Sequence, residues 1–202
     1  MKKIGVVAFV VSLAVSSAMA GLGAGWTEQT WDFAQGGSQF GLLPSQIDNV
    51  YGTPVGLIND MSGGQGVQWD NGAWQGPEFK IILDIPNQPV ANPEKILWIT
   101  LTYRGDVSFL WIADVDTGDL FHPVADAVVT TDPTNGWTTL TQQWFFKPNP
   151  REEIVAIGLK GAAGALAAID SVTIKTWCVP EPATMAVFGL GTVLMLGLRK
   201  KA

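Results

Sequence analysis

Strict alternation of apolar and polar residues is the feature that most constrains the fold of this chain. Over 79–85 an apolar residue stands at every second position, and the pattern recurs over 97–103 and 107–113. The three apolar sets are Phe79, Ile81, Leu83 and Ile85; Leu97, Ile99, Leu101 and Tyr103; and Val107, Phe109, Trp111 and Ala113. A period of two residues predicts strands that bury one face, here the face carrying these sets.

Turn signals separate these segments, and no stretch between residues 21 and 178 carries a sustained helical period. Asp-Asn-Gly at 70–72 and Arg-Gly-Asp at 104–106 are typical tight turns, as are 116–119 and 132–136. Further strands are predicted at 26–33, 66–70, 125–131, 137–146, 153–159 and 166–177. Eight or nine strands of this kind predict one antiparallel β-sandwich over 21–178. We expect a jelly roll, with an immunoglobulin-like sandwich as the second choice.

The Gly-rich segment 34–66 is the weakest part of this pattern. Only 51–58 resembles a strand there, so we expect a long loop-bearing excursion over one sheet. In contrast, Asn71-Gly72 suits the centre of a two-residue type I′ hairpin, in which both central residues need a positive φ. Asp70 and Ala73 then close the loop, and Trp69 faces Trp74 on the next rung.

Two apolar segments flank the predicted sandwich. Lys2 and Lys3 precede an apolar run at 4–15, and Ala18-Met19-Ala20 follows it. These are the three parts of a secretory signal helix, so we expect 1–20 to be a signal peptide that is cleaved after Ala20. At the other end, 183–198 is an uncharged run of 16 residues, closed by Arg199, Lys200 and Lys201. As a helix it spans about 24 Å, slightly short of a lipid hydrocarbon core. The basic end would lie on the cytoplasmic side.

The C-terminal segment 179–202 resembles the PEP-CTERM sorting signal of Gram-negative bacteria. The resemblance rests on Pro180, Glu181 and Pro182, then the apolar run dotted with glycines, then the basic end. It implies export by the secretion machinery, transient anchoring in the inner membrane by the C-terminal helix, and recognition by an exosortase-type membrane protease. The destination it implies is the outer surface or the extracellular space. A plain C-terminal anchor is the alternative. More loosely, 169–178 resembles the last strand of jelly-roll domains that precede such signals.

Charge and cysteine content agree with an extracellular protein. Residues 21–178 hold seven Lys and Arg against 17 Asp and Glu, a net charge of −10. Such an acidic domain argues against nucleic acid as a partner. Cys178 is the only cysteine, so no intrachain disulfide can form. It is either a buried small residue or a thiol that pairs between chains.

Enzyme signals are poor. Glu152 and Glu153 are adjacent, so on a strand they point to opposite faces and cannot act as a facing acid/base pair. His122 is the only histidine, which argues against a catalytic triad or a zinc site. We therefore expect a protein that is not an enzyme and needs no cofactor, with a glycan hydrolase as the weakest candidate.

Two binding sites are candidates. Asp114, Asp116 and Asp119 resemble the opening of a calcium loop, although Ala125 stands where such loops carry their last Glu. A solvated turn explains the same residues. The second candidate is a sugar platform formed by Trp69, Asp70, Asn71 and Trp74, because aromatic faces stack on sugar rings while polar neighbours bind hydroxyls. Burial of these Trp in the core is the competing explanation.

The expected function is therefore that of an exported structural or adhesive protein of the cell surface or extracellular matrix, associated with exopolysaccharide. A lectin-like carbohydrate-binding module that uses exposed Trp residues is the alternative.

Overall fold

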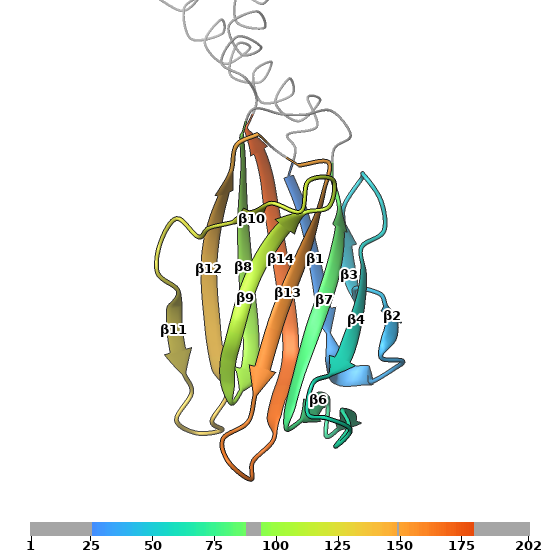
Figure 1. Cartoon of the computed structure of the whole chain (residues 1–202), viewed down its shortest axis with the longest axis vertical. Coiled ribbons are helices and arrows are strands. Elements are labelled where there is room, and N and C mark those ends of the chain that lie inside the picture. Colours follow the sequence, from blue (N-terminus) through green and yellow to red (C-terminus); the bar gives the residue numbers. More distant parts are fainter. Residues whose placement is uncertain (1–25, 88–93, 149, 180–202) are drawn as a thin grey trace, which may run out of the picture.

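The computed structural model describes residues 26–87, 94–148 and 150–179, and these form a two-layer β-sandwich (Figure 1). Both sheets are antiparallel, and the helical content of the described chain is one 3-10 turn, η1 (Phe33–Gln35). The predicted all-β fold is confirmed. The predicted signal helix and C-terminal apolar helix lie outside the described residues. Within the described part, no helix is long and apolar enough to cross a membrane.

The first sheet has eight strands. The main path runs β11-β12-β8-β14-β1-β3, and β5 and β6 extend it by pairing β6 with β14. Its strands are β1 (Trp26–Asp32), β3 (Gln46–Asp48), β5 (Gln68–Asp70), β6 (Ala73–Gly76), β8 (Glu94–Arg104), β11 (Val128–Thr131), β12 (Thr138–Phe146) and β14 (Ala167–Val179).

The second sheet has six strands in the order β10-β9-β13-β7-β4-β2, and it faces the viewer in Figure 1. Its strands are β2 (Phe40–Leu42), β4 (Val55–Asp60), β7 (Glu78–Pro86), β9 (Asp106–Asp114), β10 (Leu120–Phe121) and β13 (Glu152–Lys160).

Strand order identifies the topology as a jelly roll. The chain crosses between the sheets at nearly every step, from β7 to β8 to β9 and from β12 to β13 to β14. As a result, β14 lies between β1 and β8 in one sheet, while β13 lies between β7 and β9 in the other. Two interlocked Greek keys of this kind define the jelly roll. An immunoglobulin-like sandwich would not insert the last strand beside the first in this way.

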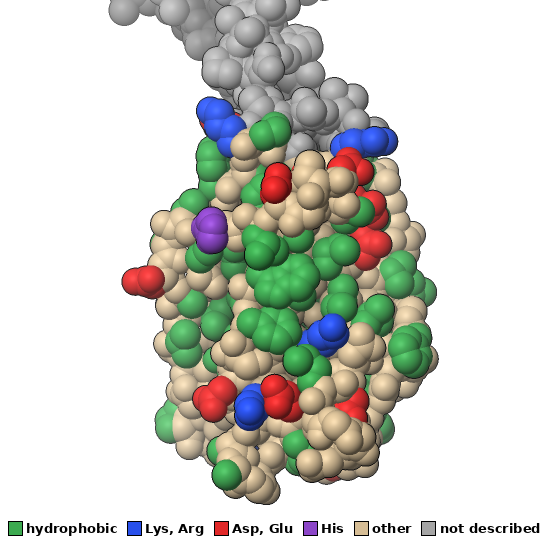
Figure 2. Space-filling model, viewed as in Figure 1, with side chains coloured by type: hydrophobic (Ala, Val, Ile, Leu, Met, Phe, Trp, Pro, Cys, Tyr) green, Lys and Arg blue, Asp and Glu red, His purple; other side chains and the backbone are tan. Residues whose placement is uncertain are grey.

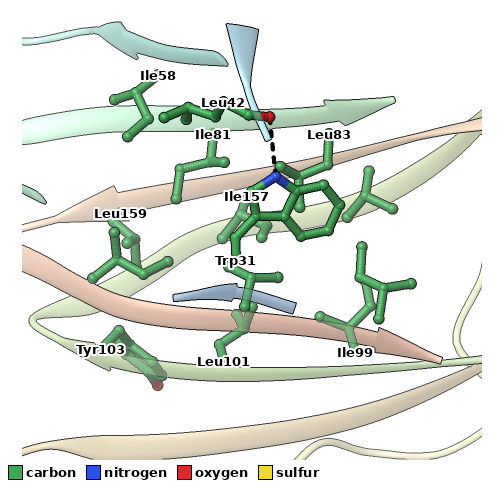
Figure 3. Packing of buried hydrophobic residues seen from close by; sticks show 14 of the residues in the cluster. Trp31, Leu42, Ile58, Ile81, Leu83, Ile99, Leu101, Tyr103, Ile157 and Leu159 are labelled. Carbon is green, nitrogen blue, oxygen red and sulfur yellow. Dashed lines mark hydrogen bonds between the residues drawn. The ribbon is translucent and has the colours of Figure 1, made fainter. Parts of the chain in front are cut away.

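The core fills the space between the sheets and is built from the alternating sets. The apolar faces of β7 and β8 are almost completely buried, as are those of β13 and β14. Trp31 reaches from β1 across this core, and its indole Nε1 donates a hydrogen bond of 3.2 Å to the carbonyl of Leu42 in the opposite sheet (Figure 3).

For β9, the face that was predicted to be buried is wrong over part of the strand. On β9 the core side holds Val107, Leu110 and Ile112 rather than Phe109 and Trp111. A bulge causes this, because Leu159 pairs with Val107 while Gly158 pairs with Phe109, so the alternation shifts by one residue. The Phe109 ring lies over Gly158, where a Cβ would come within 2.3 Å of it. Apolar side chains gather in the middle of this outer face (Figure 2).

The segment 34–66 is more regular than predicted, since it contributes the short strands β2 and β3 as well as β4. The β5–β6 hairpin is as predicted. Asn71 and Gly72 have φ values of 49° and 82°, and Trp69 pairs with Trp74.

Candidate binding groove

The outer face of the eight-stranded sheet carries a groove of about 520 Å³. It is lined by residues of β8, β11, β12 and β14 and of the turn that joins β11 to β12. Its lining residues are Thr102, Thr130, Thr131, Asp132, Asn135, Trp137, Thr139 and Asp170. The groove therefore combines one aromatic ring with hydroxyls, one amide and two carboxylates.

Hydrogen bonds within the turn fix the wall of the groove. The carboxylate of Asp132 accepts a hydrogen bond of 2.8 Å from the backbone N–H of Thr134, and the side chain of Asn135 accepts one of 2.9 Å from Trp137 N–H. Gly136 adopts a φ of 73° that glycine tolerates without strain, and its N–H donates to the carbonyl of Asp132. The turn is thus held in place before any ligand arrives.

Arg104, at the end of β8, supports the same wall. Its guanidinium carbon lies 4.4 Å from the centre of the Trp137 ring, and its Nη2 donates a hydrogen bond of 2.7 Å to the carbonyl of Asn135. A guanidinium stacked on a Trp ring is a cation–π contact. It restrains the indole, because the cation holds one side of the ring while the turn fixes its backbone.

The floor of the groove is a ladder of hydroxyl side chains. Thr139 pairs with Thr102 on one side and with Thr130 on the other, so their side chains share one face of the sheet. The next rung along continues the ladder with a hydrogen bond between the hydroxyls of Thr100 and Thr141. A ring beside ordered hydroxyls and carboxylates can stack on an apolar ring face and hydrogen-bond its hydroxyls, and the volume suits a ligand of a few rings.

The predicted sugar platform does not form as expected. Trp74 is only 4% exposed and belongs to the core cluster, so its ring is closed to ligands. Trp69 is 42% exposed, and its Nε1 donates a 2.8 Å hydrogen bond to the carbonyl of Phe33. Asp70 and Asn71 are exposed and bond to each other. Of the four predicted residues, three therefore remain at the surface, with one aromatic ring.

The predicted calcium residues lie in and around the β9–β10 turn. The carboxylate of Asp114 accepts hydrogen bonds from the backbone N–H groups of Asp116 and Thr117, of 2.8 and 3.4 Å. Asp119 closes the turn through its carbonyl, which accepts from Asp114 N–H. Among the described residues, no three His, Cys, Asp or Glu side chains form a group that could hold a metal ion. Of the three predicted residues, Asp114 supports the turn with its carboxylate, whereas Asp119 does so with its backbone.

The predicted sorting residues Pro180, Glu181 and Pro182 and the basic residues Arg199, Lys200 and Lys201 lie outside the described residues, directly after the end of β14. Residues 179–201 match the PEP-CTERM protein-sorting motif. The chain carries a PEP-CTERM sorting signal. This motif indicates a protein that is exported by a Gram-negative bacterium, and it implies processing by an exosortase.

A comparison with curated proteins gives no match. Among solved structures, TmCBM61 in complex with beta-1,4-galactotriose is 14% identical over 59% of this chain and 80% of its own, with a TM-score of 0.33. CBM35 from Cellvibrio japonicus Abf62 is 15% identical over 76% of this chain and 99% of its own, with a TM-score of 0.34. At such TM-scores the likeness is slight, and the jelly-roll assignment rests on the strand order.

Sequence reasoning missed the groove, although part of its signal is local. Asp132, Asn135 and Trp137 stand within six residues, as a polar turn that ends in an aromatic residue. The rest comes from Thr102, Thr139 and Asp170, on three strands that only the fold brings together. Such a set has no common sequence motif.

Proposed function

We propose that the exported domain is a non-enzymatic structural or adhesive component of the cell surface or extracellular matrix, and that it holds polysaccharide in the groove beside Trp137. The groove is the observation that carries the proposal. It offers a ring for stacking and several hydrogen-bonding groups whose backbone is fixed in advance. A preorganised site loses little entropy on binding.

The position of the groove supports the same role. The chain enters the sandwich at Trp26 and leaves it at Val179, at one end of the molecule, where Trp26 pairs with Trp177 (Figure 1). Thr102 and Asp170 lie towards the opposite end of β8 and β14. A chain held at a membrane by its C-terminal segment would therefore present the groove away from that membrane.

The test is binding to exopolysaccharide purified from the native host, measured by affinity electrophoresis. Trp137→Ala removes the ring, and Asp170→Asn removes a carboxylate while keeping its shape; we expect each to weaken retardation at least about tenfold, as the loss of a stacked or charged contact does. Trp69→Ala is the matched control, because it deletes an exposed Trp on the other side of β14 and should bind normally. Unchanged retardation in both groove variants would contradict the proposal.

A lectin-like module is the second candidate, and the volume of the groove, about 520 Å³, favours it because it suits an oligosaccharide of a few rings. A lectin saturates on a defined oligosaccharide, whereas a matrix protein cofractionates with polymer and shows no discrete ligand. Asp132 and Asp170 both line the groove, so the same samples should be assayed for reducing ends. Release of reducing ends would identify the groove as a hydrolase site and contradict the non-enzymatic role.

Export and processing are tested by mass spectrometry of the protein from its native host. We expect the mature chain to begin at Gly21 and to end near 180–182. A mature protein that keeps Arg199, Lys200 and Lys201 would show that the C-terminal segment serves as a permanent anchor.

A further inference from the structure

One ion pair crosses the core of the sandwich and joins its two sheets. The Nζ of Lys95, on β8, contacts Oε1 of Glu153, on β13. The relative exposure of the two side chains is 1% and 0%. Both residues occupy core positions of the alternating pattern, in line with Leu97 on β8 and Val155 on β13.

The residues around this pair are apolar except for Asp114. Phe146 and Cys178, both buried, flank Lys95 in register on the neighbouring strands. Ile85, completely buried, flanks Glu153 on β7, and Asp114 stands opposite on β9. Within the described residues, Oε2 of Glu153 has no hydrogen-bond partner.

An ion pair in such a place is costly, because both charges lose their hydration and one contact does not repay it. Burial, the largest effect, raises the pKa of the Glu153 carboxyl, and the charge of Asp114 raises it further, while Lys95 opposes the shift. Transfer of the proton from the ammonium to the carboxylate removes both charges. It leaves a neutral amine, which is nucleophilic, in contact with a carboxylic acid.

We propose that Lys95 and Glu153 condense to an isopeptide bond that links β8 covalently to β13. In this step Nζ of the neutral amine attacks Cδ of the protonated carboxyl. The Cδ–Nζ bond forms, one C–O bond breaks, and the departing hydroxyl leaves with one amine proton as water. The second amine proton stays on the amide nitrogen, and no oxidant, reductant or activated co-reactant is needed.

Two features favour the amide over the ion pair. Groups fixed in contact react with effective concentrations of about 10⁵–10⁸ M, which compensates for a slow reaction between unactivated partners. The amide is also uncharged, so the folded state no longer bears the desolvation cost of two buried charges. In an exported chain with one cysteine, such a link would join the two sheets where no intrachain disulfide can.

Peptide mass fingerprinting of the full-length chain after trypsin tests the bond directly. A linked Lys95 cannot be cleaved, so peptide 81–104 should appear joined to peptide 152–160, lighter than their sum by one water molecule. Peptides 81–95 and 96–104 should be absent. Finding 81–95, 96–104 and 152–160 as separate peptides at full yield would overturn the proposal.

The chain supplies its own control. Lys175 and Glu28 form a pair with the same chemistry, at 3.0 Å, with side chains 43% and 39% exposed. Because water stabilises those charges, they should give unlinked peptides in the same digest. A link at both pairs would show reaction during sample handling and would count against a reaction specific to the core.

A double variant confirms the assignment without relying on a single substitution that might not fold. Lys95→Met with Glu153→Leu keeps the apolar volume and removes both reacting groups. On a denaturing gel the linked wild-type chain should migrate faster than this variant, because a cross-link keeps the unfolded chain more compact. Identical migration of the two chains would count against the bond.

Discussion

Trp31 and Trp69 provide a matched pair that measures what burial adds to one hydrogen bond. Each indole donates to a backbone carbonyl, Trp31 to Leu42 at 3.2 Å and Trp69 to Phe33 at 2.8 Å. Trp31 is 1% exposed and Trp69 is 42% exposed. The carbonyl of Phe33 also accepts a hydrogen bond from the N–H of Gly36, so it keeps a partner when the indole is removed.

Phe at these two positions should therefore have unequal effects. Trp31→Phe leaves the Leu42 carbonyl without its indole donor in the core, which costs about 1–3 kcal/mol. The smaller ring adds roughly 1 kcal/mol for the space it leaves. We expect a total loss of about 2–4 kcal/mol in the free energy of unfolding. Trp69→Phe should lose less than about 1 kcal/mol, because water reaches the site.

Urea unfolding followed by far-UV circular dichroism measures both values, compared through the midpoints at a common slope. Equal losses of unfolding free energy in Trp31→Phe and Trp69→Phe would refute the reasoning. Burial would then have no effect on how much each hydrogen bond stabilises the fold.

Further predictions concern the β5–β6 hairpin, the neighbouring carboxyl groups of Glu152 and Asp84, and the turn that holds Asp114. Gly72→Val should lower the stability by about 1–2 kcal/mol, because a β-branched residue is strained at a φ of 82°, and an unchanged melting temperature would contradict this. The protonated Glu152 carboxyl donates a hydrogen bond to the Asp84 carboxylate, and this bond, together with burial and the charge of Asp84, raises the pKa of Glu152 to about 7. Since the folded-state pKa lies above the usual one, stability should fall as pH rises through about 7, and Glu152→Gln should flatten that part of the urea-midpoint profile. EDTA should leave the melting temperature unchanged, because the Asp114 carboxylate already accepts a hydrogen bond within its turn. A rise in melting temperature on adding calcium would contradict this and support the calcium site predicted from the sequence.

The long strands could be predicted because a sandwich buries one face of each of them. On β7 and β8 the buried positions alternate over the whole strand, so the period of two is visible without knowing the partners. On β13 the alternation holds only as far as Val155, because the next four residues are all buried. The β5–β6 hairpin was predictable for a different reason, since Asn-Gly fixes both the turn type and the register of Trp69 against Trp74.

Positions that depend on pairing could not be predicted. The bulge on β9 shifts the face of Phe109 and Trp111, and it lies beside Gly158 on the neighbouring strand, whose missing side chain leaves room for the Phe109 ring. The burial of Trp74 is similar: pairing in the hairpin was foreseen, but which of the two rings enters the core depends on β14, which pairs with β6. The charged Lys95 occupies a core position because its partner Glu153 comes from the other sheet.

The jelly roll is also compatible with the sorting signal at the C-terminal end and with the predicted signal peptide at the N-terminal end. Because β14 inserts between β1 and β8, the first and last strands are neighbours in the middle of a sheet, with register from Trp26–Trp177 to Asp32–Ser171. Cleavage beyond either end removes none of these pairs. β14 also pairs through Val179 with Glu94, one residue before Pro180. A protease that cuts at the sorting motif therefore works directly beside a paired strand, whereas a cut within β14 would require that strand to leave the sheet. The fold thus favours processing at or after 180 and leaves the groove, at the far end of β14, unaffected by the cut.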